Sequence, residues 1–116
     1  MTRPLPRRAG GLVAGFALTA TLLLGHGPAW STEHVVSQKG KAFSVKKLKV
    51  KVGDSVKFVN EDPFSHNVFS LSATKGFDLG SYPQGGAKSV TFDKAGTVDV
   101  ECAIHPDMTM SVEVEK

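Results

Sequence analysis

Four side chains in the second half of the sequence carry donor atoms that soft metal ions prefer. Cys102, His105 and Met108 lie within seven residues, and His66 stands upstream in Ser65-His66-Asn67-Val68. One thiolate, two imidazoles and one thioether are the donors of a trigonal His₂Cys copper site with a weak axial methionine. Sulfur donors suit Cu(I) and imidazole suits both oxidation states, so such a site can pass single electrons with little rearrangement. The donor types and their spacing therefore predict a redox-active copper centre.

Cys102 is the only cysteine of the chain, so it cannot form an internal disulfide. It is either buried and inert, bonded to another molecule, or a metal ligand. Taken singly, each of the four donors also fits an ordinary structural position, such as a buried thiol or a core methionine. A tetrahedral zinc site is a further alternative, but methionine is a poor zinc ligand and copper binds more tightly than zinc to such donors. The whole set favours copper.

The first 31 residues have the composition of a secretory signal peptide. Three arginines lie within residues 3–8, an uncharged run of sixteen residues follows at 9–24, and small residues come after it. This order is typical of a secretory signal, and the run is shorter than the roughly 20 residues that span a bilayer. Cleavage after Ala29 and after Ser31 both fit. We therefore expect a signal peptide at 1–31, an exported periplasmic domain at 32–116 and no stable membrane insertion after cleavage.

Removal of the N-terminal segment changes the charge balance of the chain. The three arginines among its 14 basic residues lie in that segment, which leaves 11 lysines against 11 acidic residues. A neutral domain gives no argument for nucleic-acid binding. Seven of the lysines fall between positions 39 and 57. We interpret them as the wet face of a sheet edge, and a docking patch for an acidic redox partner is the alternative.

From residue 34 onward the hydrophobic pattern has a period of two. At 47–52, lysines alternate with Leu48, Val50 and Val52, which is typical of a half-buried strand. Similar patterns predict strands at 55–60, 66–70, 87–92, 97–102 and 110–115, whereas the glycine-rich stretch 71–86 is expected to loop over the surface. Short strands at this spacing imply an all-β fold, an antiparallel sandwich or barrel.

The same alternation places the donors at one end of the predicted fold. Cys102 shares a strand face with the two preceding valines, so its side chain should point inward. Met110, and Met108 if the strand extends back, share a face with the inward valines of the last strand. His105 lies in the turn between these strands, and His66 begins a strand of its own. All the donors can therefore converge without a long-range contortion of the chain.

Three segments carry a family resemblance: Val50 to Asn60, His66-Asn67-Val68, and Cys102 to Met108. Together they resemble the plastocyanin/azurin family of blue copper proteins (the cupredoxins), in an amicyanin- or pseudoazurin-like form. The resemblance extends from about residue 42 to the end, and the combined motif is far more specific than any of its parts. It implies a cupredoxin-like Greek-key antiparallel β-sandwich of about seven or eight strands.

The resemblance also implies a role for each donor. His66 is the upstream imidazole ligand, Cys102 the thiolate, His105 the second imidazole and Met108 the axial thioether of one type 1 copper, which cycles between Cu(I) and Cu(II). Asn67 is expected to tie the two ligand loops together and to form a hydrogen bond near the thiolate. Contacts of that kind tune the reduction potential of a metal.

Met110 is an alternative axial ligand. It stands at the Cys-x₂-His-x₄-Met spacing that resembles plastocyanin and pseudoazurin. In the short-loop, amicyanin-like pattern the axial methionine comes four residues before the first inward valine of the last strand, which fits Met108 and Val112. We therefore predict that Met108 is the axial ligand and that Met110 is a core or rim side chain.

His34 has no role in the family pattern. If cleavage follows Ser31, the exported chain begins Thr32-Glu33-His34. A free amine, two amides and a histidine at the third position form a square-planar nitrogen site that suits Cu(II). This second copper site is a hypothesis that depends on the cleavage position, and a solvated N-terminal histidine is the alternative.

The resemblance implies a monomeric electron carrier rather than an enzyme. His105 is expected at the surface, within an apolar rim of Pro63, Phe64 and Pro106, where electrons enter or leave. An amicyanin-like resemblance points to a periplasmic amine dehydrogenase as donor and a c-type cytochrome as acceptor. The alternative functions are a periplasmic copper-binding or copper-delivery protein with the same ligands, and a structural β-sandwich without metal.

Overall fold

The computed structural model describes residues 30–116, of which Ser31–Lys116 form one compact unit. This part contains eight strands: β1 (Glu33–Gln38), β2 (Lys47–Lys51), β3 (Ser55–Asn60), β4 (His66–Leu71), β5 (Gly76–Tyr82), β6 (Ala87–Thr91), β7 (Gly96–Glu101) and β8 (Thr109–Glu115). The expected signal peptide at 1–31 lies outside the described residues except for its last two positions. Within the described part, no helix is long and apolar enough to cross a membrane.

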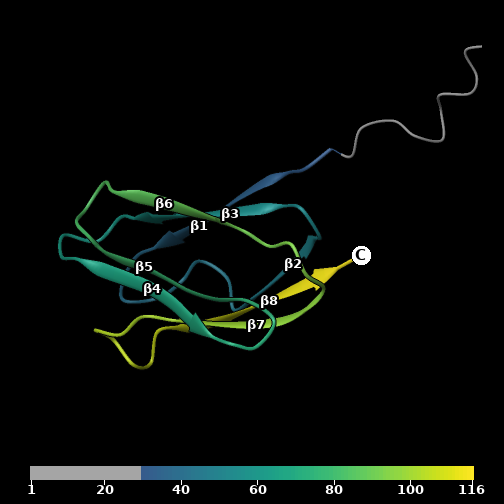
Figure 1. Cartoon of the computed structure of the whole chain (residues 1–116). Helices are drawn as coiled ribbons and strands as arrows, with labels where there is room; N and C mark the ends of the chain where they lie inside the picture. Colours follow the sequence, from purple (N-terminus) through teal and green to yellow (C-terminus); the bar gives the residue numbers. More distant parts are fainter. Residues whose placement is uncertain (1–29) are drawn as a thin grey trace, which may run out of the picture. The chain divides into compact units, whose positions relative to one another are not determined.

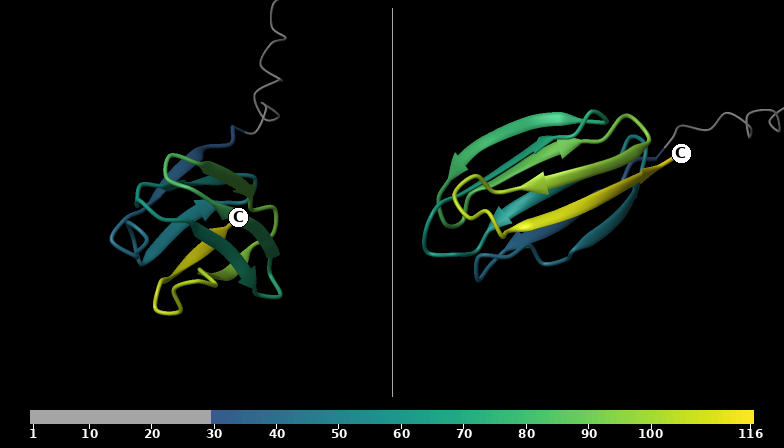
Figure 2. Two further views of the ribbon diagram at one scale, coloured as in Figure 1. Left: turned by 90° about the vertical axis from the view of Figure 1, so that its left-hand side faces the viewer. Right: turned by 90° about the horizontal axis from the view of Figure 1, so that it is seen from below.

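The strands form two sheets that pack face to face (Figures 1 and 2). One has the order β1-β3-β6 and the other the order β2-β8-β7-β4-β5, so the expected β-sandwich is confirmed. The sheets are mixed rather than purely antiparallel, because β1 pairs with β3, and β2 with β8, in parallel. The chain reaches β3 from β1 by way of β2 in the other sheet, and such crossovers join parallel strands.

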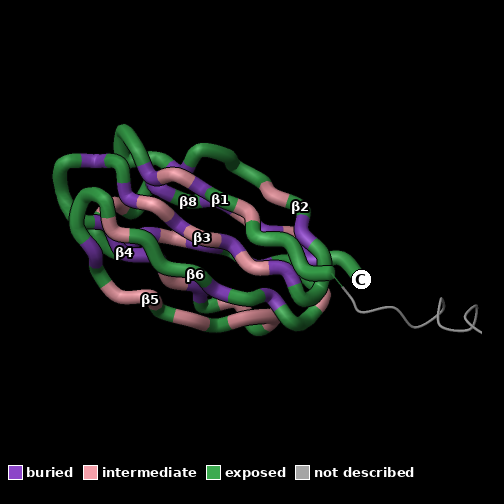
Figure 3. The backbone as a smooth tube through the Cα atoms, turned by 90° about the horizontal axis from the view of Figure 1, so that it is seen from above, coloured by how far each residue is buried: buried purple, intermediate pink, exposed green. Residues whose placement is uncertain are grey.

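Alternating burial along the strands builds one apolar core between the sheets. In β3 and β8 every second residue is buried, which the burial colours along β3 in Figure 3 make visible. Phe58, Phe92 and Val98 have no exposed surface, and burying a side chain of this size stabilises a fold by roughly 1.5–3 kcal/mol. The expected inward position of Cys102 is also found, since the residue is 2% exposed.

The expectation of a surface loop over 71–86 is wrong, because β5 lies within it. This strand pairs antiparallel with β4 and forms an edge of the five-stranded sheet. Phe77 and Leu79 pack against the core, and Gly80 has a φ of +76°. An edge strand bonds to a neighbour on one side only, so it tolerates glycines that would weaken a central strand. The glycine-rich composition therefore hid a real strand.

The lysines of β2 lie on the opposite edge of the same sheet. Lys47, Lys49 and Lys51 are exposed, and the register places Lys49 beside Glu113 and Lys51 beside Glu115 of β8. Lys47 Nζ is 3.3 Å from a carboxylate oxygen of Glu113. The glutamates compensate much of the positive charge, which supports the interpretation of these lysines as a protected sheet edge.

A buried carboxylate fastens β1 to the turn between β2 and β3. Asp54 accepts hydrogen bonds of 2.9 Å from the backbone N–H of Thr32, the backbone N–H of Lys51 and Nε2 of His34. The bond from His34, followed by those from Lys51 and Thr32, lowers the pKa of Asp54 from 3.8 to about 2. Asp54 is therefore charged in the fold at every pH above this range.

We predict that the ionisation of Asp54 makes the free energy of unfolding depend on pH in the acid range. The unfolded chain takes up a proton near pH 3.8 and the folded chain near pH 2. The stabilisation by Asp54 is therefore complete above about pH 4 and is lost as the pH falls toward 2. Urea unfolding of the copper-free protein should show that Asp54→Asn is less stable than the parent at pH 7 and that the difference narrows below pH 4. A difference that stays constant with pH would contradict this.

Candidate metal centre

Strand pairing brings the two ligand segments to one end of the sandwich. β4 begins at His66 and β7 ends just before Cys102, and these strands pair antiparallel with Phe69 opposite Glu101. In an antiparallel pair the start of one strand lies beside the end of the other. His66 and Cys102 are therefore neighbours in space although 36 positions separate them in the sequence.

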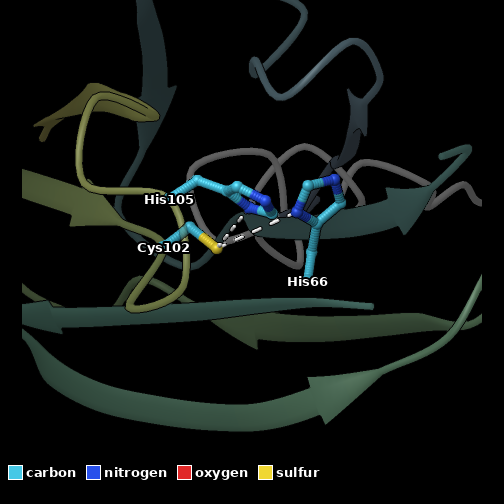
Figure 4. Close-up of side chains that lie close together, drawn as sticks. All are labelled: His66, Cys102 and His105. Atoms are coloured by element: carbon cyan, nitrogen blue, oxygen red, sulfur yellow. Dashed lines mark hydrogen bonds between the residues drawn. The ribbon is translucent and has the colours of Figure 1, made fainter. Parts of the chain in front are cut away.

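The three strongest donors face one another (Figure 4). Nδ1 of His66 lies 3.9 Å from Sγ of Cys102, and Nδ1 of His105 lies 3.8 Å from the same sulfur. All three donor atoms lie within 4.8 Å of one another. With metal–sulfur and metal–nitrogen distances of about 2.3 and 2.0 Å, an angle near 120° separates two donors by about 3.7 Å. The observed distances therefore suit one metal ion bound by all three.

The donors differ in their access to solvent. His66 is 0% and Cys102 is 2% exposed, whereas His105 is only half-buried. Burial protects a thiolate from oxidation by solutes, and close packing holds the buried ligand side chains in fixed rotamers. His105 is thus the one donor of the three that a second molecule could approach.

Two backbone hydrogen bonds close the loop that carries Cys102, His105 and Met108. The N–H of Cys102 donates to the carbonyl oxygen of Met108 at 3.2 Å, and the N–H of Met108 donates to that of His105 at 2.9 Å. Met108 is 1% exposed. Met110 lies in β8, where it pairs with Val100 of β7. Met108 therefore belongs to the ligand loop and Met110 to the sheet.

Asn67 spans the two ligand segments. Its Oδ1 accepts a hydrogen bond from the N–H of Ala103 at 3.0 Å, and its own N–H points at Sγ of Cys102 at 3.5 Å. Its Nδ2 donates to Asp78 of β5 at 3.0 Å. The side chain thus joins the start of β4, the loop after β7 and β5. An N–H directed at a thiolate withdraws electron density from the sulfur.

Asp62 is a part of the centre that sequence reasoning missed. Its Oδ2 lies 2.6 Å from Nε2 of His66 and accepts from the N–H of Lys41, while Oδ1 accepts from the N–H of Gly40. Burial raises the pKa of Asp62, but the hydrogen bonds from Lys41, His66 and Gly40 outweigh it and bring the pKa to about 2. The only sequence signal was an acidic residue four positions before a candidate ligand.

An aromatic and aliphatic rim surrounds His105. The ring of Phe64 packs against the rings of His66 and His105, with centroid distances of 5.3 and 5.5 Å. A shallow hollow beside the rim is lined by Lys41, Ile104, His105, Pro106, Asp107 and Met108. Phe64 and Pro106 were expected in the rim. Ile104 was not, and Lys41 was considered only as one of the seven lysines between positions 39 and 57. Ile104 is 52% exposed, so the rim presents apolar surface to solvent.

A buried tyrosine, Tyr82, is the cross-strand neighbour of His66. The two residues are paired across β4 and β5, and the Tyr82 hydroxyl donates to Oε1 of the buried Gln38. Burial raises the pKa of Tyr82, and the charge of Cys102 adds to that rise. The phenol therefore stays neutral and adds no charge to this side of the centre.

The side chain of His34 is hydrogen-bonded to a carboxylate in this fold. Its imidazole is engaged with Asp54, and it pairs with Val56 in the ladder between β1 and β3. A square-planar Cu(II) site at Thr32-Glu33-His34 needs the backbone nitrogens of these residues as well as the imidazole. Such a site therefore competes with the hydrogen bonds from Thr32 and His34 to Asp54, and it stays a hypothesis.

A two-sheet sandwich with a buried cysteine and two histidines gathered at one end defines a copper-binding protein of the cupredoxin class. Residues 31–115 match the family described as copper binding proteins, plastocyanin/azurin family. The chain belongs to this family, and copper is its metal.

Similar proteins point the same way. The chain is 37% identical to amicyanin from Paracoccus denitrificans over 76 residues, 63% of this chain and 58% of that one. It is 34% identical to the methylamine utilization protein MauL from Methylorubrum extorquens over 100 residues, 85% of this chain and 84% of that one. The structure of a methionine-to-alanine mutant of amicyanin in its Cu(I) form superposes with a TM-score of 0.68 at 32% identity and covers 72% of this chain and 82% of that one.

The fold alone does not separate carriers from enzymes. A copper-containing nitrite reductase from Thermus scotoductus also superposes with a TM-score of 0.68 at 28% identity. The match covers 72% of this chain but only 22% of the enzyme. The same sandwich is therefore found as one part of a much larger enzyme.

We predict that Asn67→Ala loosens the ligand loops. The change removes two side-chain hydrogen bonds and should lower the free energy of unfolding by about 1–2 kcal/mol in the copper-free protein. Hydrogen exchange at the N–H of Ala103, which loses its acceptor, should become faster. In the control Asp78→Ala, Asn67 keeps its bond to Ala103, and exchange there should not change. Equal exchange at Ala103 in the parent and in Asn67→Ala would refute the role of this bridge.

Proposed function

We propose that this chain is an exported blue copper protein that carries single electrons between larger redox proteins. Cys102, His66 and His105 would hold one copper ion, and Met108 would be its fourth, weaker ligand. The observation that carries the proposal is the convergence of these three donors within 4.8 Å at one end of a cupredoxin sandwich. Copper bound there would take up one electron as Cu(II) and release it as Cu(I).

The residues around the donors favour retention of the metal over delivery. His66, Cys102 and Met108 are each at most 2% exposed. A delivery protein needs ligands that a receiving protein can reach, whereas here only His105 is accessible. Ligand side chains that packing holds in place keep the same geometry in both oxidation states. The structural rearrangement that accompanies electron transfer is then small. This supports an electron carrier.

The position of Met108 supports it as the axial ligand. It shares backbone hydrogen bonds with Cys102 and His105, whereas Met110 is held in the ladder between β7 and β8. A ligand in the closed loop moves with the other two ligands. Met110 then contributes to the core between the sheets, where it is 4% exposed.

The rim of His105 is the proposed point of electron entry and exit. Phe64 and Ile104 offer apolar contact area there, and Lys41 and Asp107 add one charge of each sign. We propose a periplasmic dehydrogenase as donor and a c-type cytochrome as acceptor. The names of the similar proteins, an amicyanin and a methylamine utilization protein, support an amine dehydrogenase in the first role.

The domain plan and the location rest on the N-terminal sequence. We propose that residues 1–31 direct export and are removed, and that residues 32–116 work in the periplasm as a monomer. We further propose that the chain is a carrier and not an enzyme. Within residues 30–116 one group of three donors suits a metal ion, and the remaining histidine there is engaged with Asp54.

We predict that the domain 32–116 turns intensely blue on addition of Cu(II). The colour is the charge-transfer absorption of a Cu(II)–thiolate bond in a His₂Cys site. The protein should then pass through repeated cycles of reduction and oxidation without loss of copper. A colourless protein would refute the blue copper site. A blue protein that releases its metal on reduction would favour the delivery function instead.

We predict that replacing Met108 and replacing Met110 have different effects on the copper centre. Met108→Ala and Met110→Ala each remove a buried side chain and should each lower the free energy of unfolding by roughly 2–5 kcal/mol without copper. Only Met108→Ala should change the visible spectrum and the reduction potential of the copper form, because only that side chain is a ligand. If Met110→Ala alone changes them, the assignment is reversed.

A further inference from the structure

A buried carboxylate that is not one of the metal donors lies directly behind His66 in the hydrogen-bond network. Asp62 is 4% exposed and lies two residues after β3. It accepts three hydrogen bonds: from Gly40 N–H at 2.7 Å, from Lys41 N–H at 3.0 Å and from His66 Nε2 at 2.6 Å. His66 is the only cationic or potentially cationic side chain with which it pairs in the described part.

We propose that Asp62 is a positioning residue of the copper centre, which holds His66 with Nδ1 toward Cys102 and lowers the reduction potential through its buried negative charge. This inference rests on the proposed function, because the potential is defined only for a copper-loaded carrier. The tautomer of His66, in contrast, is a property of the protein without metal.

The hydrogen bond to Asp62 selects one tautomer of His66. A carboxylate only accepts, so the short contact requires the proton of a neutral imidazole to sit on Nε2. The lone pair is then on Nδ1, the atom that lies 3.9 Å from Sγ of Cys102. A metal ion needs that lone pair. Asp62 therefore prepares the ligand and fixes the plane of the ring before the metal arrives.

The charge of Asp62 acts in the same direction on the metal. Oxidised copper carries one more positive charge than reduced copper, so a nearby anion stabilises the oxidised form more. The effect is strong where water is excluded, and both His66 and Asp62 are almost fully buried. The carboxylate also draws the Nε2 proton toward itself, which makes Nδ1 a stronger donor to Cu(II).

The same carboxylate fastens the rim to the buried ligand. Gly40 and Lys41 have φ values of +65° and +58°, and this left-handed pair directs two successive N–H groups at one anion. The left-handed conformation is unfavourable for lysine, and the hydrogen bonds to Asp62 hold it in place. Lys41 Nζ then lies 5.7 Å from the ring centre of Phe64, which packs on both histidines.

Asp54 offers a matched control, because Asp54 and Asp62 flank the same strand, β3. It stands just before β3, whereas Asp62 stands just after it. Asp54 is also 4% exposed, and it accepts from two backbone N–H groups and from Nε2 of one histidine. The two carboxylates thus have the same kind of partners at opposite ends of β3, and only Asp62 lies beside the donors.

The experiment compares Asp62→Asn with Asp54→Asn. Both variants should lose stability to urea without copper. In the copper-loaded protein, Asp62→Asn should shift the ratio of Cu(I) to Cu(II) affinity about tenfold toward Cu(I), a rise in potential of ~59 mV. Asp54→Asn should leave the potential at the parent value. If neither variant changes the potential, or both change it equally, Asp62 has no electrostatic role at the copper.

A second measurement needs no variant and no metal. NMR of the ring nitrogens in the copper-free parent should find His66 protonated on Nε2 and bare on Nδ1, with slow exchange of the Nε2 proton. A proton on Nδ1 would overturn the positioning role even if Asp62→Asn fails to fold. This result is independent of the proposed function, because failure to form a blue copper site would leave the tautomer of His66 still measurable.

Discussion

The candidate copper centre depends on one backbone register, the pairing of β4 with β7 that sets Phe69 opposite Glu101. This register brings the first residue of β4 beside the residue that follows β7. A shift by one position would turn every side chain of a strand to the other face, and Cys102 would leave the core. Val68 of β4 and Val98 and Val100 of β7 lie in the same buried core, and their packing favours that register. The positions of the metal donors thus depend on the apolar packing of the strands that carry them.

Polar side chains at the same end of the sandwich hold the irregular segments in place through hydrogen bonds. The segment between β3 and β4 and the segment between β7 and β8 both lie outside the strands. Asn67 links them through Ala103, and Asp62 holds Gly40 and His66. Each buried hydrogen bond here has a donor or acceptor that would otherwise lie unpaired in an apolar site, so the positions of these groups are sharply defined. The three donors can then keep one arrangement in two oxidation states.

The sequence predicted those parts of the protein that follow from local periodicity. The inward side of Cys102 and the turn position of His105 both followed from alternation with a period of two. β5 did not, because an edge strand with glycines lacks that pattern, and the parallel pairings did not, because they depend on crossovers between sheets. The role of Asp62 was also beyond reach. Two of its partners are backbone N–H groups of Gly40 and Lys41, and no side-chain pattern encodes where a backbone amide points.

The place of β8 governs the order in which the protein can assemble. It is the last strand along the chain, yet it lies inside the five-stranded sheet between β2 and β7. β2 has no other neighbour in that sheet, and its first residue, Lys47, pairs with Ser111, which lies far away in the sequence. Contacts this far apart in the sequence close large loops, and closing a large loop costs chain entropy. Because Met108 directly precedes β8, the ligand loop is complete only when β8 has joined the sheet. Copper that reaches a partly folded chain can contact the Cys102 thiol. The three donors come together only in the completed sandwich.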